Sequence, residues 1–395
     1  MKNKVRINVS GVISDENRFI LPWSGRGINY NDEDINLVIK AMREADPLTQ
    51  GSYQEEFERI FSEYHENIPS FATSSGAGAL ELSADLIDIK PGDEIIIPAH
   101  TYVASAIPYA RRGAKLVWAD IDIDTRIVTA ETIVSKITSK TKAVIPVHLY
   151  GLCAEMEEII SLADKHNIWV IEDCAQAHGA QIDGVSVGNI GDANVFSFYP
   201  TKILGAYGDG GMITTNSEEL SDASQRLRFY GMEKKKMSSG HWNGKYYSLE
   251  HGMNSRLDEL HAAILLKKLN HLDEYILTRC KIAKRYDNEL SSTSMILPRE
   301  RLDNKYVYYV YVVKHPKRDL FIEKLRERDI HVNISYPWPI HTMAGYEYLG
   351  WKDGDLPITE RYANEIFSLP MYPTLTNDEQ TEVINAVKEI DKMLM

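Results

Sequence analysis

Seven short apolar runs, separated by amphipathic stretches, limit the folds that the first two-thirds of this chain can adopt. The runs are Ser70–Thr73, Glu94–Ile97, Lys115–Trp118, Ala143–Val147, Trp169–Ile171, Ala193–Phe198 and Met212–Thr215. Most are apolar almost throughout rather than alternating, which is typical of strands buried on both faces. Helical patterns lie between them, at Ala77–Leu86, Val103–Ala110 and Ala154–Lys165. This alternation predicts an α/β fold with a mostly parallel, seven-stranded sheet.

The flanking segments predict a helix before the sheet and a second domain after it. Glu33–Met42 has the pattern of an amphipathic helix with an acidic first turn. A long helical stretch, Ser255–Leu290, leads into the last third. That third contains a strand pattern at Val307–Lys314, helix patterns at Asp319–Arg328 and Asn377–Met393, and a short apolar segment at Val332–Ile334. We therefore predict a large α/β domain over residues 1–268 and a smaller α+β domain over residues 269–395.

Composition excludes several classes of partner. The chain has 395 residues and a net charge of −13, which argues against nucleic acid as a ligand. The three cysteines, Cys153, Cys174 and Cys280, are too few and too widely spaced for a disulfide framework and fit a reducing compartment. No signal peptide follows Met1–Arg6, and no apolar run approaches the length of a membrane span. We expect a cytoplasmic protein without a membrane partner.

The position of Lys202 indicates covalent chemistry. It lies between the sixth and seventh apolar runs, and a lysine held between buried strands is costly to desolvate unless its amine is neutral, paired or used covalently. A neutral amine attacks carbonyl groups, so the position favours Schiff-base formation. Upstream, Asp173 ends another apolar run. Pyridoxal phosphate needs both groups, a lysine for its aldehyde and a carboxylate for its pyridinium nitrogen.

Each of these residues alone has a simpler explanation. A lysine after a strand is usually a solvated loop residue, and an aspartate at a strand end is usually a helix N-cap. The combination favours a cofactor site, because Ser197 places a hydroxyl at the end of the strand before Lys202, where it can bind the cofactor phosphate. In open α/β sheets, ligands bind beyond the carboxyl ends of the strands, and these residues follow such ends.

Other residues at strand ends extend the predicted site. Gly76 and Ala77 are small residues at a helix start, where backbone N–H groups can approach a phosphate. Tyr102 follows the second run and can stack on a flat ring. Gln176 lies three residues after Asp173, which is one helical turn if a helix begins here, and can reach the ring hydroxyl. No metal site is expected, since His100 has no partner at ligand spacing.

These residues resemble the DegT/DnrJ/EryC1/StrS family of pyridoxal-phosphate-dependent sugar aminotransferases over nearly the whole chain. The motifs that carry the resemblance are Leu48-Thr49-Gln50-Gly51, Phe57-Glu58, Ser75-Gly76, Pro91-Gly92-Asp93-Glu94, His100-Thr101-Tyr102, Glu172-Asp173-Cys174-Ala175-Gln176, Ser197-Phe198-Tyr199-Pro200-Thr201-Lys202, Gly208-Asp209-Gly210-Gly211, Asn254-Ser255-Arg256-Leu257-Asp258 and Tyr336-Pro337. The resemblance implies an aspartate-aminotransferase-like fold, fold type I, in a homodimer whose active sites lie at the subunit interface.

The resemblance also implies a role for each cofactor residue. Lys202 resembles the Schiff-base lysine, and Asp173 the pyridinium partner. The remaining cofactor contacts are the ring-hydroxyl partner Gln176, the stacking residue Tyr102, the phosphate-binding residues Gly76, Ala77 and Ser197, and Asn254, a phosphate ligand given to the neighbouring subunit. The family usually has a threonine where this chain has Ala77, so a side-chain hydroxyl bond is lost while the backbone N–H remains.

Substrate contacts are predicted at Thr49, Tyr199, Tyr336 and His341, together with the loop Gly231–Tyr247. The resemblance implies transfer of an amino group, from glutamate, to a keto-sugar that is nucleotide-linked, in surface polysaccharide or natural-product sugar biosynthesis. Three alternatives stay open: a keto-inositol aminotransferase, a sugar dehydratase on the same fold, and a non-catalytic regulatory or binding protein. Lys202 argues against the dehydratase, in which a histidine replaces the lysine.

Overall fold

The computed structural model describes residues 32–232, 247–299 and 304–395. Its centre is a seven-stranded sheet in the order β1-β9-β8-β5-β4-β2-β3. The strands are β1 (Ser70–Thr73), β2 (Glu94–Pro98), β3 (Lys115–Ala119), β4 (Thr141–Val144), β5 (Trp169–Asp173), β8 (Ala193–Ser197) and β9 (Gly211–Thr214). All seven predicted runs form strands of this one sheet, which is parallel except that β9 runs antiparallel to both of its neighbours.

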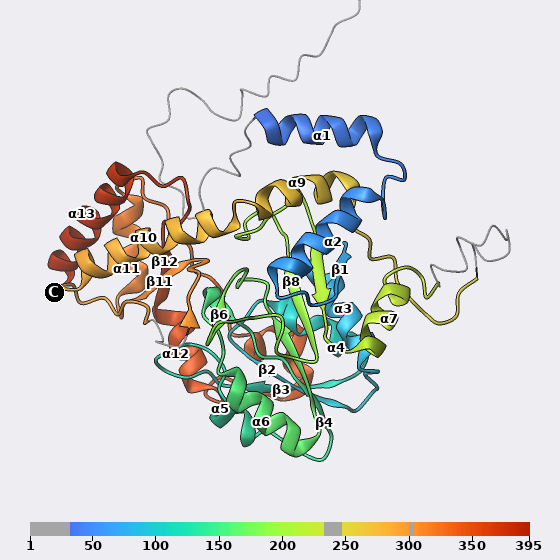
Figure 1. The fold of residues 1–395 in the computed structure, drawn as a ribbon. Helices are drawn as coiled ribbons and strands as arrows, with labels where there is room; N and C mark the ends of the chain where they lie inside the picture. The colour runs from blue at the N-terminus through green and yellow to red at the C-terminus, as the bar shows by residue number, and fades with distance from the viewer. Residues whose placement is uncertain (1–31, 233–246, 300–303) are drawn as a thin grey trace, which may run out of the picture.

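Helices lie on both sides of the sheet (Figure 1). Side chains of the central strands alternate between two buried clusters, one on each side. Phe196 of β8 lies in a buried cluster with Phe57 and Phe61 of α2 (Ser52–Tyr64). The preceding residue, Val195, lies in a different buried cluster, together with Leu80 of α3 (Gly76–Leu86). The strands are therefore buried on both faces, as their almost continuous apolar character predicted.

Further helices complete the two layers. On the same side as α2 lie α1 (Asp32–Glu44) and α9 (Glu259–Leu269), which contact each other. The other helices of this part are α4 (Ile107–Arg111), α5 (Ala130–Val134), α6 (Met156–His166) and α7 (Glu218–Leu227). The predicted helix Val103–Ala110 is instead a 3₁₀ turn, Val103–Ser105, followed by α4, and Pro108 occupies the first turn of that helix.

The C-terminal part groups α10 (Leu272–Leu290), α11 (Arg318–Arg326) and α13 (Asn377–Leu394) beside a two-stranded sheet at one end of the molecule (Figure 1). The sheet pairs β11 (Tyr311–Lys314) with β12 (Ile366–Leu369), and α12 (Pro357–Glu365) leads into β12. A further three-stranded sheet joins β10 (Asn304–Lys305) of this part to β6 (Gln181–Ile182) and β7 (Val185–Ser186) of the other.

One expectation for this region needs correction, and another remains a prediction. The long helical stretch from Ser255 is two helices, since α9 begins only at Glu259 and α10 follows a break after Leu269. The apolar segment Val332–Ile334 forms no strand and makes one isolated bridge, from Asn333 to Ser368. The division into domains at residues 268 and 269 remains a prediction.

Among the described residues, no helix is both long enough and apolar enough to cross a membrane.

Candidate active site

A cavity of about 750 Å³ lies where several parallel strands end. Segments that follow β1, β2, β5 and β8 line it, and residues 333–338 of the C-terminal part form another wall. The structure brings nine of the predicted site residues to this cavity: Gly76, Ala77, Tyr102, Asp173, Gln176, Ser197, Tyr199, Lys202 and Tyr336. Residues distant in sequence thus meet at the edge of the sheet that the fold class predicted.

Asp173, the last residue of β5, is held by two hydrogen bonds. Its Oδ2 accepts a hydrogen bond of 2.7 Å from Ser105 Oγ, and its Oδ1 accepts one of 3.1 Å from the N–H of Ala175. The side chain is nearly buried yet lines the cavity. Each oxygen keeps a free lone-pair direction, so the carboxylate can accept a further N–H from a ligand in the cavity.

Lys202 lies in the turn that follows β8. Its N–H donates to the carbonyl of Tyr199 at 2.8 Å, which fixes the backbone of the turn. The side chain is half-buried, and Nζ lies 5.0 Å from the centre of the Tyr309 ring. The lysine therefore faces the cavity with its amine partly solvated, rather than being fully enclosed between strands as the sequence suggested.

The start of α3 approaches the end of β8 closely enough to require a glycine. A Cβ on Gly76 would lie 2.6 Å from the Cβ of Ser197. Gly76 and Ala77 are the first residues of the helix, where backbone N–H groups have no partner within the helix itself. Together with the Ser197 hydroxyl they provide the donors and the positive helix end that a phosphate needs. The site therefore fits the phosphate of pyridoxal phosphate.

Gln176 connects two walls of the cavity. Its Oε1 accepts a hydrogen bond of 2.7 Å from the N–H of Tyr150, and its Nε2 donates to the hydroxyl of Tyr336. Burial raises the pKa of Tyr336 well above its ordinary value, so the hydroxyl stays protonated. Tyr336 also has a positive φ of 64° and lies 6.2 Å, centre to centre, from the ring of Tyr102. One amide N–H of Gln176 remains for a ligand.

Three predicted residues do not line the cavity. Thr49 forms an isolated β-bridge with Asp258, and Asn254 is exposed, its side-chain oxygen accepting a hydrogen bond from Arg256 Nε at 2.9 Å. His341 is buried, with Nε2 3.0 Å from Glu360 Oε1. Its placement gives no support for a substrate contact within this chain. Most of the predicted loop Gly231–Tyr247 lies outside the described residues.

The sequence analysis did not identify several residues at the cavity, among them Ser105 and Tyr309, which contact Asp173 and Lys202. Ser105 follows the motif His100-Thr101-Tyr102, but nothing in its spacing links it to Asp173. Tyr309 stands in a tyrosine-rich run that predicts only a strand. Both contacts join segments from different parts of the chain, so no local pattern identifies them.

Close to the site, His148, Glu172 and Cys174 form a buried group whose ligating atoms all lie within 4.8 Å. Glu172 accepts hydrogen bonds from His148 Nε2 at 2.8 Å and from the backbone N–H groups of Gly188, Ile190 and Gly191. Burial raises the pKa of this carboxyl, but these donors outweigh burial and hold it below its usual value. The other ring nitrogen of His148 accepts from the N–H of Ala154. Glu172 thus connects β5 to His148 and to the turn before β8, and these hydrogen bonds account for its burial without a metal ion.

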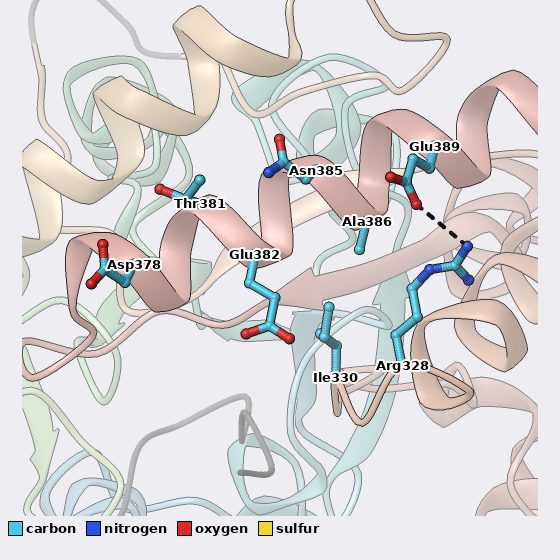
Figure 2. A pocket seen from close by; sticks show the side chains of 8 residues that line it. All are labelled: Arg328, Ile330, Asp378, Thr381, Glu382, Asn385, Ala386 and Glu389. Atoms are coloured by element: carbon cyan, nitrogen blue, oxygen red, sulfur yellow. Dashed lines mark ion pairs between the residues drawn. The ribbon is translucent and has the colours of Figure 1, made fainter. Parts of the chain in front are cut away.

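A second hollow, of about 470 Å³, lies on the C-terminal part between α13 and the segment after α11 (Figure 2). Its lining residues are Arg328, Ile330, Asp378, Thr381, Glu382, Asn385, Ala386 and Glu389. Arg328 and Glu389 form an ion pair across it. These eight residues include neither a lysine nor a buried carboxylate, so this hollow lacks the chemistry of the larger cavity.

The chain is similar to known proteins over most of its length. The profile of the DegT/DnrJ/EryC1/StrS aminotransferase family matches residues 29–388. The chain is 42% identical over 362 residues to dTDP-3-amino-3,4,6-trideoxy-alpha-D-glucose transaminase of Micromonospora megalomicea subsp. nigra, covering 90% of this chain and 94% of the relative. It is 40% identical over 363 residues to dTDP-3-amino-3,6-dideoxy-alpha-D-galactopyranose transaminase of Aneurinibacillus thermoaerophilus, covering 92% and 97%.

A solved structure has the same fold. The crystal structure of S. venezuelae DesV in complex with a ketimine intermediate has a TM-score of 0.86 to this chain at 34% identity, and the match covers 91% of this chain and 94% of that one. The cavity residues and these matches lead to one conclusion. The chain belongs to the DegT/DnrJ/EryC1/StrS aminotransferase family and is a pyridoxal-phosphate-dependent aminotransferase of fold type I.

Proposed function

We propose that this aminotransferase moves an amino group from glutamate to the keto carbon of a nucleotide-linked sugar. The observation that carries the proposal is that Lys202 and Asp173 line one cavity at the ends of neighbouring strands, beside the start of helix α3 at Gly76. The sugar class is supported by the relatives, whose names specify dTDP-linked amino sugars. We place the reaction in the cytoplasm, in the synthesis of surface polysaccharide such as lipopolysaccharide or of natural-product sugars.

When bound, pyridoxal phosphate supplies an aldehyde that receives the amino group and a ring that accepts electrons. The residues of this chain position it and move protons. Asp173 would hold a proton at the ring nitrogen, with its orientation fixed by Ser105 and Ala175. Lys202 would hold the aldehyde and would move a proton as general acid and base.

The remaining cavity residues bind the cofactor and the substrate. The backbone N–H groups of Gly76 and Ala77 and the Ser197 hydroxyl bind the phosphate. The free amide N–H of Gln176 binds the ring hydroxyl. Tyr102, Tyr199 and Trp338 are 60%, 50% and 70% exposed, and all three line the cavity. We assign these aromatic side chains to stacking on the cofactor ring and on the flat faces of the substrate.

We further propose that the active enzyme is a homodimer that shares its sites. Asn254 is exposed and lies outside the cavity of its own chain. Its neighbour Ser255 is buried and lies 3.2 Å, oxygen to oxygen, from Ser74, close to the start of α3. The turn is therefore held in place by Ser255 while Asn254 is exposed, which suits a residue given to the partner's phosphate site.

The test is a screen with purified protein loaded with pyridoxal phosphate. Wild type and Lys202→Ala are each incubated with glutamate and with 3-keto or 4-keto sugars linked to dTDP or UDP, and amination is followed by mass spectrometry. Amination of a nucleotide-linked keto-sugar by wild type alone supports the proposal. Amination of a keto-inositol in preference, or of no keto substrate with any amino donor, would overturn it. Visible absorbance separately reports whether the aldehyde is attached to Lys202.

A further inference from the structure

Tyr309 lies against the reactive amine of Lys202 although it comes from the C-terminal part of the chain. The Lys202 Nζ lies 5.0 Å from the centre of the Tyr309 ring, and the Tyr309 hydroxyl lies 3.2 Å from Thr201 Oγ1. Both side chains line the same cavity. An ammonium group within about 6 Å of a ring centre is attracted by the electrons of the ring face. The tyrosine therefore contacts the lysine by its ring and the lysine's neighbour by its hydroxyl.

The backbone of Tyr309 is fixed on both sides, so the ring position is built into the fold. Its N–H donates to the carbonyl of Tyr150 at 2.9 Å, and its carbonyl accepts from Arg279 at 3.0 Å. Arg279 is itself buried and also bonds the carbonyls of Tyr308 and Met371. The residue after Tyr150 favours glycine, since Gly151 has a φ of +93° and a Cβ on it would lie 2.7 Å from Cγ2 of Val307 and 3.1 Å from the nitrogen of Tyr309.

No nearby carboxylate of the described residues pairs with the Lys202 amine, so the ring face of Tyr309 is its neighbour. Within the described residues Lys202 forms no ion pair, and Asp173 is engaged by Ser105 and Ala175. Asp209, which also lines the cavity, is exposed to solvent. When the amine carries a proton, the contact that the structure provides is therefore the face of Tyr309.

We propose that Tyr309 is a positioning residue for proton transfer by Lys202, holding the protonated amine beside the reacting carbon. The inference rests on the proposed transamination. In the step concerned, the C–H bond at the α-carbon of the amino donor breaks and an N–H bond forms at Nζ, while the electron pair stays with the donor and the bound cofactor. Nζ later returns the proton, so none is gained or lost overall.

Two substitutions separate the ring from the hydroxyl. Tyr309→Phe keeps the ring face and removes the contact with Thr201, whereas Tyr309→Leu removes both. Tyr306→Leu serves as the matched control, because Tyr306 stands in the same segment, is nearly buried against Tyr308 and does not line the cavity. Thermal melting of each variant shows whether it is folded.

The first measurement is the rate of the amino-donor half-reaction, followed by cofactor absorbance with glutamate that carries hydrogen or deuterium at its α-carbon. Tyr309→Leu is expected to slow the reaction by roughly three- to thirty-fold, the range of a cation–π contact, and to enlarge the isotope effect because proton transfer becomes more rate-limiting. Tyr309→Phe is expected to stay within about twofold of wild type. Equal loss in both variants, or an isotope effect unchanged in Tyr309→Leu, would overturn the proposal.

The second measurement needs no transamination. Pyridoxal phosphate is added to cofactor-free protein, and the growth of the visible band that reports attachment to Lys202 is timed. Attachment uses the neutral amine, whereas the ring face of Tyr309 favours the protonated one. We therefore expect faster attachment in Tyr309→Leu, and wild-type rates in Tyr309→Phe and Tyr306→Leu. Equal rates in all four proteins would contradict a positioning role. If wild type accepts no amino donor, the proposed function fails, and this rate still decides the role of Tyr309.

Discussion

Ser105 donates a hydrogen bond of 2.7 Å from its Oγ to Oδ2 of Asp173, although 68 residues separate the two. Both side chains are nearly buried. Ser105 in turn lies 3.2 Å, oxygen to oxygen, from Thr101, so a short polar chain leads from the segment after β2 to the carboxylate at the end of β5. The carboxylate is therefore oriented by a residue from the segment after β2 as well as by the N–H of Ala175 in the turn that follows β5.

Removing this hydrogen bond is expected to slow turnover without preventing cofactor binding. Ser105→Ala frees one oxygen of Asp173 to rotate, so the contact with the ring nitrogen loses direction. A hydrogen bond to a charged group corresponds to a loss of roughly tenfold or more in rate. Steady-state kinetics measure the effect. Ser83→Ala is the control, since Ser83 is also buried and bonds Tyr109, and its rate should stay near wild type.

Asp173→Asn keeps the size of the side chain but removes its charge. Without the carboxylate, the proton at the ring nitrogen is no longer held, and we expect a loss of roughly two or more orders of magnitude in rate. The donor half-reaction, followed in a stopped-flow spectrometer, measures this directly. A rate within about twofold of wild type would mean that Asp173 acts only through the N–H of Ala175, as a cap.

The sheet was predictable because its signal is local. All seven apolar runs became strands, and the ends of β1 match the prediction to the residue. Helix α2 was not predicted, and its start explains why. Its N-cap, Gly51, makes no side-chain hydrogen bond, and the carboxylate of Glu259 accepts from the N–H groups of Gly51, Tyr53 and Gln54 instead. Because the capping carboxylate comes from a residue 208 positions away, the sequence around Gly51 has no pattern that predicts the start of the helix.

The cofactor residues were predictable to the extent that each follows a strand. Asp173 and Lys202 stand at or just after the carboxyl ends of β5 and β8, where an α/β fold places its ligand. Gln176 and Gly76 were found in the same way. The contacts of Asp173, Gln176 and Lys202 with Ser105, Tyr336 and Tyr309 depend on how separate segments pack. That information is tertiary, so residue types and spacing do not contain it.

Acid should destabilise the fold through buried neutral histidines, of which His65 is the clearest test. Burial lowers its pKa from 6.5 to about 4, and its ring stacks on Phe61 at 4.2 Å between centres. Below pH 6.5 the unfolded chain binds a proton at His65 that the folded chain does not bind until about pH 4. Stability should therefore fall with decreasing pH between these values, by up to about 1.4 kcal/mol per pH unit from this residue.

Urea unfolding of cofactor-free protein at a series of pH values measures that slope. His65→Gln removes the titrating group, so its stability should depend less steeply on pH in this window than that of wild type. Phe61→Leu is the control, because it weakens the same cluster without removing a titrating group and should lower stability by a similar amount at each pH. Identical slopes for wild type and His65→Gln would refute the assignment.

Sharing of active sites between two chains predicts that two inactive variants restore each other. Lys202→Ala should lack the attachment point for the aldehyde, and Asn254→Ala should lack a phosphate ligand in the partner's site. A two-fold interface is self-complementary, so each chain gives one Asn254 and receives one. A mixed dimer then holds one site with both defects and one site with neither.

The experiment unfolds and refolds the two variants together, after wild type has been shown to survive the same cycle. Random mixing makes about half of the dimers mixed, each with one intact site, so about a quarter of wild-type activity should return. Refolding each variant alone gives the baseline, and differently tagged chains show by sequential affinity capture that mixed dimers form. Asn254 lies outside the cavity of its own chain, and the shared site explains that position. Mixed dimers without recovered activity would instead assign Asn254 to its own chain's site or to no site.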